Sequence, residues 1–145
     1  MKAVKIKFLT KYNAILAALL SLLGFSSSCG IFPGTEYGTP HAKFMVNGNI
    51  VSATTNQAVQ GIKVKMAYDS TTSSVNGIYS VKDGFGFPQS QTYTVTFRDI
   101  DGAANGQFQD LDTTIEFKDP KFTNGDGHWY EGETTKELDI KLKPK

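Results

Sequence analysis

The chain has 145 residues, a single cysteine and a formal net charge of +1, which fits one domain and leaves little room for a second. Its charge is uneven, because four of the 15 basic residues precede the first apolar run; from Cys29 onward 11 basic residues face 14 acidic ones, about −3. A nucleic-acid-binding surface needs clustered positive charge to neutralise phosphates. The charge distribution therefore excludes nucleic acid as the expected partner.

The first 28 residues contain the parts of an export signal. Four lysines lead into an apolar run from Ala14 to Phe25, which has the length of a signal h-region and is shorter than a membrane span. Three serines follow, and then Cys29 and Gly30. This arrangement resembles bacterial lipoproteins, in which the signal peptidase cuts before a cysteine that carries diacylglycerol. The resemblance implies a signal helix and signal peptide over 1–28 and lipidation of Cys29.

Chemistry supports the same assignment of Cys29. A thiolate is the nucleophile that can take a lipid, and a lone cysteine in an exported chain has no intramolecular disulfide partner. Two or more acyl chains give stable membrane anchoring, so the protein is expected to be anchored to a membrane without spanning it. The alternative is a secreted protein with a stray cysteine near its cleavage site.

Residues 29–40 are predicted to be a lipidated tether, because Gly and Pro interrupt every periodic run in this segment. The segment lacks the acidic cluster after the cysteine that resembles the surface-export signal of some Bacteroidetes lipoproteins. We therefore expect a cell-envelope protein on the outer membrane, and we favour a domain that faces the periplasm over one at the cell surface.

From residue 41 onward apolar and polar residues alternate with a period of two, which predicts strands. The first is expected over 43–50 with a bulge at Gly48, and the last over 138–142 after a long loop. The strands expected between them lie at 62–66, from 79 onward, at 92–98 and at 113–117. Turns are expected at Asn76–Gly77, Asp83–Gly84, Asp101–Gly102, Asn105–Gly106 and Asn124–Gly125.

Strands with one apolar face bury that face economically when two sheets stack. The predicted fold is therefore all-β, an antiparallel β-sandwich over residues 41–145. The segments Phe44–Val51, Gln60–Val64 and Asn76–Tyr79 resemble the carboxypeptidase-regulatory-like family, which implies a transthyretin-like or Ig-like sandwich.

A narrower resemblance covers more of the chain. The lipoprotein signal, the segment Glu36–Ala42, the turn Asn76–Tyr79 and the acidic stretch Asp99–Phe108 look like the Bacteroidetes family of radical SAM-associated lipoproteins. Genes of that family lie beside a gene for a radical SAM enzyme. The resemblance implies that this chain is a substrate or partner of such an enzyme.

Tyr37, Thr39 and His41 place an aromatic ring, a hydroxyl and an imidazole next to a turn. Such a combination suits a recognition or modification motif. The alternative is a segment that clamps the entering chain against the edge of the sandwich.

One Gly-containing loop carries several oxygen ligands of the kind that Ca²⁺ prefers, namely Asp99, Asp101, Asn105 and Asp110. Gly102 follows the second Asp directly, so the spacing departs from the EF-hand pattern. The alternatives are a calcium site, the one cofactor considered for this chain, and a group of solvated acids in turns.

His128, Trp129 and Tyr130 form an aromatic and ionisable cluster in the long loop before the last expected strand. Exposed together, the rings could contact a ligand by stacking on a sugar. The alternative is that Trp129 covers an open end of the core, because a Trp buries a large area.

The sequence favours a protein that is not an enzyme. His41 and His128 are the only histidines, no zinc-binding spacing or G-x-S-x-G motif is present, and a lipidated Cys29 has no free thiol for catalysis. Two functions therefore stand as hypotheses. The first is a non-catalytic envelope lipoprotein whose sandwich has binding or structural roles, and the second is an exported substrate or partner of a radical SAM maturase.

Overall fold

The computed structural model describes residues 11–19 and 38–145 of the chain. Residues 11–19 form a helix inside the predicted signal segment. Residues Gly38–Lys145 form a separate compact unit, so this unit includes three residues that we assigned to the tether. Cys29 and Tyr37 lie outside the described residues.

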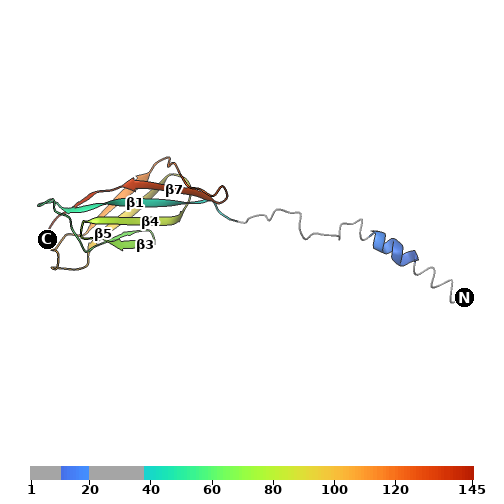
Figure 1. The fold of residues 1–145 in the computed structure, drawn as a ribbon, viewed down its shortest axis with the longest axis horizontal. Coiled ribbons are helices and arrows are strands. Elements are labelled where there is room, and N and C mark those ends of the chain that lie inside the picture. Colours follow the sequence, from blue (N-terminus) through green and yellow to red (C-terminus); the bar gives the residue numbers. More distant parts are fainter. Residues whose placement is uncertain (1–10, 20–37) are drawn as a thin grey trace. The chain divides into compact units, whose positions relative to one another are not determined.

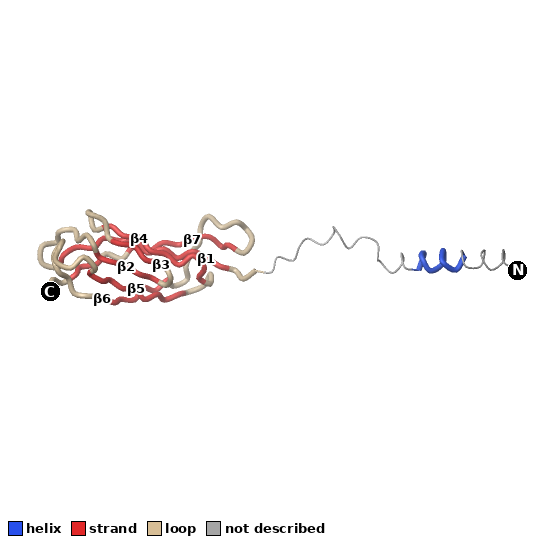
Figure 2. The backbone as a smooth tube through the Cα atoms, turned by 90° about the horizontal axis from the view of Figure 1, so that it is seen from below, coloured by secondary structure: helices blue, strands red, loops and turns tan. Residues whose placement is uncertain are grey.

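The compact unit consists of two stacked sheets, which confirms the predicted all-β sandwich (Figures 1 and 2). The first sheet contains β1 (His41–Ser52), β4 (Ile78–Gly86), β7 (Tyr130–Glu137) and β8 (Ile140–Leu142). The second has the order β3 (Asp69–Thr72), β2 (Ile62–Met66), β5 (Gln91–Asp99) and β6 (Leu111–Phe117).

Pairing in the first sheet is mixed. β4 pairs with β1 in the antiparallel direction, whereas β7 and β8 both run parallel to β1. All three strand pairs of the second sheet are antiparallel. The central strand β1 therefore has partners on both sides over most of its twelve residues.

The core lies between the sheets and comes from the alternating apolar residues. In β1 the side chains of Phe44, Val46 and Ile50 are fully buried, while their neighbours are exposed or half-buried. Phe44 packs edge-on against Phe117 with ring centroids 5.1 Å apart, and Tyr79 packs edge-on against a ring of the other sheet. Such contacts between sheets add to the stability that burial itself provides.

Gly48 was predicted to be a bulge, and this was wrong. The register between β1 and β4 is continuous across Gly48, and the irregularity lies between Ala42 and Phe44. A Cβ at Gly48 would instead fall on the carbonyl oxygen of Leu138 and 3.1 Å from the ring of Tyr79. A glycine is needed here because two segments of backbone approach closely.

Three further expectations about the strands need correction. Asp83–Gly84 lies inside β4 rather than in a turn. The loop expected before the last strand is shorter, because β7 begins at Tyr130. The last predicted strand begins at Ile140 rather than at Leu138.

Candidate functional site

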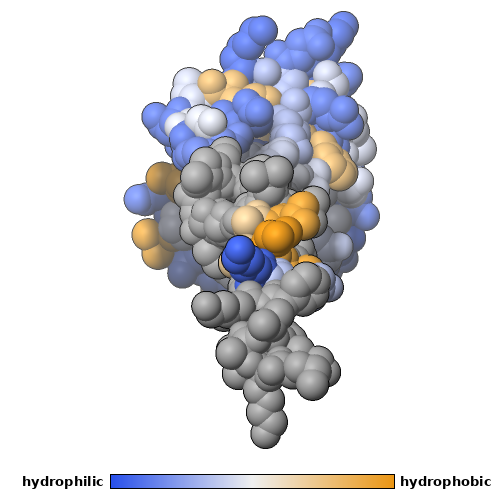
Figure 3. Space-filling view, turned by 90° about the vertical axis from the view of Figure 1, so that its right-hand side faces the viewer, coloured by the Kyte–Doolittle hydropathy of each residue, from blue (hydrophilic) through white to orange (hydrophobic). Residues whose placement is uncertain are grey.

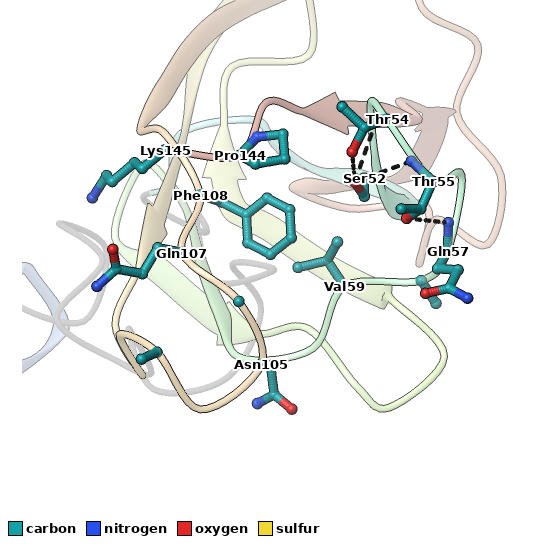
Figure 4. A pocket seen from close by; sticks show the side chains of 13 residues that line it. Ser52, Thr54, Thr55, Gln57, Val59, Asn105, Gln107, Phe108, Pro144 and Lys145 are labelled. Carbon is teal, nitrogen blue, oxygen red and sulfur yellow. Dashed lines mark hydrogen bonds between the residues drawn. The ribbon is translucent and has the colours of Figure 1, made fainter.

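A pocket of about 590 Å³ opens at the end of the sandwich where β1 and β8 finish (Figure 4). We call it the distal pocket. Three segments line it: the loop after β1, the loop after β5, and the C-terminal residues that follow β8. Its lining residues are Ser52, Thr54, Thr55, Gln57, Ala58, Val59, Ala103, Asn105, Gly106, Gln107, Phe108, Pro144 and Lys145.

The buried hydroxyl of Ser52 organises the loop after β1. Its Oγ accepts hydrogen bonds from the backbone N–H groups of Thr54 and Thr55, each with a donor–acceptor distance of 3.4 Å. The loop closes when the N–H of Ser52 donates to the carbonyl of Gln57 over 2.8 Å. Asn56 has a positive φ of 55°, a conformation that Asn adopts more readily than most residues. One rim of the pocket is thus fixed by local hydrogen bonds.

Phe108 and Val59 form the apolar interior of the distal pocket, and Figure 4 shows the ring of Phe108 between Val59 and Pro144. The N–H of Phe108 donates to Asp99 over 2.8 Å, and Phe108 forms an isolated bridge with Pro144. The C-terminal residue is also held, because the N–H of Lys145 donates to the carbonyl of Gln107 over 2.9 Å. The opposite rim is therefore tied to the end of the chain.

The chemistry of the distal pocket is mostly neutral and polar. Hydroxyls and amides both donate and accept hydrogen bonds, and Lys145 supplies the one cation among the lining residues. None of these residues has a side-chain carboxylate or imidazole that could act as a general base. Pockets of this volume, with a few polar groups around an apolar floor, are typical of small-molecule sites.

The structure brings two of the predicted motifs together at the opposite end of β1. Thr39, His41 and Trp129 line a second pocket of about 470 Å³, together with Gly38, Pro40, Phe85 and Phe87. We call it the aromatic pocket. Tyr130 stands beside it, with its ring centroid 5.5 Å from that of His41.

The chain that enters β1 is fastened under Trp129. A Cβ at Gly38 would come within 2.7 Å of the Trp129 ring, and the N–H of His41 donates to the carbonyl of Trp129 over 2.8 Å. For the described residues 38–41, these contacts are those expected of the clamp that we considered for residues 37–41. Trp129 is not part of the core cluster, so it covers the entering chain rather than an open end of the core.

The remaining residues around the aromatic pocket fall into two groups. His128 is exposed and lies outside the lining, with its backbone N–H bonded to Asp126 over 2.9 Å. Phe85 and Phe87 were not expected at a site. The signal that could have revealed them is a pair of phenylalanines on either side of Gly86, at the end of a strand. The side chains of Phe85 and Phe87 are 84% and 57% exposed.

Each of the four proposed calcium ligands has a protein partner, although Oδ1 of Asp101 is buried without a hydrogen bond. Asp99 accepts the backbone N–H groups of Gly102 and Phe108, and Asp110 lies 3.5 Å from Arg98. Burial raises the pKa of Asp99, but the backbone hydrogen bonds lower it by more, so the net pKa of Asp99 is below its ordinary value.

Asp101 and Asn105 bond to each other through their side chains. Within the described ranges, no group of three or more His, Cys, Asp or Glu residues could hold a metal ion.

Within residues 11–19 and 38–145, no helix is long and apolar enough to cross a membrane. The predicted lipidation at Cys29 and the ring of Tyr37 fall in the part of the chain that the structure does not describe.

Comparison with known proteins does not identify a family for the chain. No family model matches the chain, and no curated protein matches it. One similar solved structure is a dioxygenase domain from a dioxygenase and carbohydrate-binding protein fusion of the cellulolytic bacterium Streptomyces sp. SirexAA-E. It is 12% identical, with a TM-score of 0.38 over 73% of this chain and 84% of that one.

Proposed function

We propose that the protein is a non-catalytic, lipid-anchored protein of the cell envelope whose sandwich presents the distal pocket to a neutral, hydroxyl-rich ligand such as a short glycan. The distal pocket carries this proposal. Its volume of about 590 Å³ accommodates a few sugar rings, and its hydroxyl and amide rim suits ligands that both donate and accept hydrogen bonds. Anchoring rests on the cationic and apolar segment before Cys29.

No lining side chain is a carboxylate or an imidazole, which favours binding over catalysis. The side chains of Asn105 and Ser52 are already fixed by protein groups. The amide of Asn105 bonds to Asp101, and the hydroxyl of Ser52 holds its loop. Gln57 and Gln107 would then make the adjustable contacts with a ligand.

The test is chemical-shift mapping of the ¹⁵N-labelled protein with cello-, chito- and xylo-oligosaccharides as probes. The expected shifts concentrate in residues 52–59, 103–108 and 144–145. Gln57→Ala and Gln107→Ala should weaken them, whereas Gln89→Ala is a matched control, because Gln89 is exposed after β4 and lies outside the lining. Shifts that spread evenly, or none at millimolar sugar, would refute the glycan proposal.

Anchoring is tested separately by fatty-acid labelling and membrane fractionation of the wild type and Cys29→Ser. Labelling that disappears in the variant supports the lipid anchor. An unlabelled wild type refutes it.

The alternative function, as an exported substrate of a radical SAM maturase, is favoured by one observation: Thr39 is exposed at the start of the compact unit, where a modifying enzyme can reach it. Intact-mass and peptide mass spectrometry of the native protein separates the two functions. A mature chain that is unmodified apart from Cys29 would count against the substrate role.

A further inference from the structure

Two strongly exposed aromatic rings line the aromatic pocket. Phe85 and Phe87 extend from the end of β4 and are 84% and 57% exposed. Trp129 and His41 complete the lining beside them. Where the domain is visible around the grey atoms in Figure 3, its surface is mostly hydrophilic with separate apolar patches. A cluster of exposed rings in a polar surface marks an interaction site.

The position of this cluster along the chain indicates its partner. Gly38 and Pro40 line the aromatic pocket, and Gly38 follows Cys29 by only nine residues. Nine extended residues reach at most roughly 30 Å. A lipid on Cys29 would therefore keep this end of the sandwich close to the bilayer. The distal pocket lies at the other end of β1, whose twelve residues span roughly 40 Å.

The side chains at this end suit the interfacial region of a bilayer. Trp and Tyr rings concentrate at the headgroup level, where an apolar ring and a polar edge are both satisfied. Trp129 and Tyr130 provide such rings, and Phe85 and Phe87 provide apolar surface that can enter the acyl boundary.

Charge at this end does not favour anionic lipid. Asp126 and Glu131 flank the two interfacial rings in sequence, and Lys43 is paired with Glu133 over 2.8 Å. Attraction between a basic patch and acidic headgroups is therefore not needed, and zwitterionic lipid should suffice.

We propose that the aromatic pocket docks on the headgroup region of the bilayer that anchors the chain, which directs the distal pocket away from the membrane. The inference rests on the proposed lipid anchor. It goes further by assigning an orientation and a lipid-contacting surface formed by Phe85, Phe87, Trp129 and Tyr130.

The experiment uses Trp129, the single tryptophan of the chain, as its own reporter. The purified, acylated protein is reconstituted into phosphatidylcholine vesicles, with or without bromine on the acyl chains, and floated on a density gradient. Docking predicts that brominated lipid quenches the emission of Trp129. Adding phosphatidylglycerol should not increase the quenching.

A double variant, Phe85→Ser with Phe87→Ser, should still float but lose the quenching. The matched control is Val75→Ser with Ile78→Ser. These side chains are 68% and 56% exposed and lie before and at the opposite end of β4, so quenching should persist. All four side chains are exposed, so both variants should fold.

Three results would overturn the proposal. Floating protein without quenching would mean that the aromatic pocket faces another occupant, such as a second copy or a protein. Equal loss of quenching in both double variants would remove the assignment to this end. Protein that does not float would refute the anchor, and the docking inference with it.

Discussion

Gly48→Ala should be one of the most damaging small substitutions in the domain. The added Cβ would fall on the carbonyl oxygen of Leu138. That oxygen also accepts the hydroxyl of Tyr79 over 2.6 Å, and the N–H of Leu138 donates to Asn47 over 2.8 Å. Both groups belong to the backbone, so neither can move aside without separating β1 from the link between β7 and β8.

The magnitude follows from two effects. Overpacking at a site that cannot relax costs about 1–3 kcal/mol, and loss of the hydrogen bond from Tyr79 costs about 1 kcal/mol more. We expect the free energy of unfolding to fall by about 2–4 kcal/mol. For a domain near one hundred residues this corresponds to a decrease in Tm on the order of 10–20 °C.

The assay is urea unfolding of the purified protein, followed by fluorescence of its one tryptophan. Gly84→Ala is the matched control, because an added Cβ there meets nothing within 4 Å and its φ is not in the left-handed region. It should change stability by less than about 0.5 kcal/mol. If the two variants unfold within that margin of each other, the close approach at Gly48 does not constrain the fold.

Three other predictions concern polar groups. Ser73→Ala should cost about 1–3 kcal/mol in urea unfolding, because the buried hydroxyl donates to Val59 and accepts from Ile62, while Ser74→Ala, at an exposed hydrogen bond, should be nearly neutral. The hydrogen bond from Lys43 lowers the pKa of Glu133, so this carboxylate stabilises the folded state above its unfolded pKa, and the stabilisation is lost as the pH falls below about 4.5. Glu133→Gln should reduce this acid sensitivity. Equal urea midpoints of the wild type at pH 3 and pH 7 would contradict the prediction. Millimolar Ca²⁺ should leave the Tm unchanged, because Asp99 and Asp110 already have protein partners, and an increase would restore the calcium hypothesis.

Local alternation was enough to predict the strands whose pattern is imposed by one buried face. In β5 the polar residues that alternate with Val95 and Phe97 indicate a strand with one buried face. The bounds of β2 were predicted without error. β7 was missed because it is mostly polar: it is an edge strand, and only Gly132 within it is buried. Its parallel pairing with β1 joins segments about ninety residues apart, which no local pattern reveals.

The candidate sites show the same division. Sequence reasoning selected Thr39 and His41 in one motif and Trp129 in another, but only the pairing of β1 with β7 brings them into a single pocket. The distal pocket was missed, because its rim combines two loops of ordinary turn composition with the last two residues of the chain. The acidic residues of the turn were a weaker guide, since Asp99 accepts from neighbouring backbone and Asp110 pairs with a side chain, that of Arg98.

The parallel arrangement of β1 and β7 also determines how the domain would bear a mechanical load. A pull applied between the start of β1 and the end of the chain acts along the strands and shears β1 against its neighbours. Many ladder hydrogen bonds must then fail together, whereas a hairpin pulled open at one end loses them one at a time. A domain that is held at the start of β1 and pulled from its other end would thus resist extension, because the force would act along the strands.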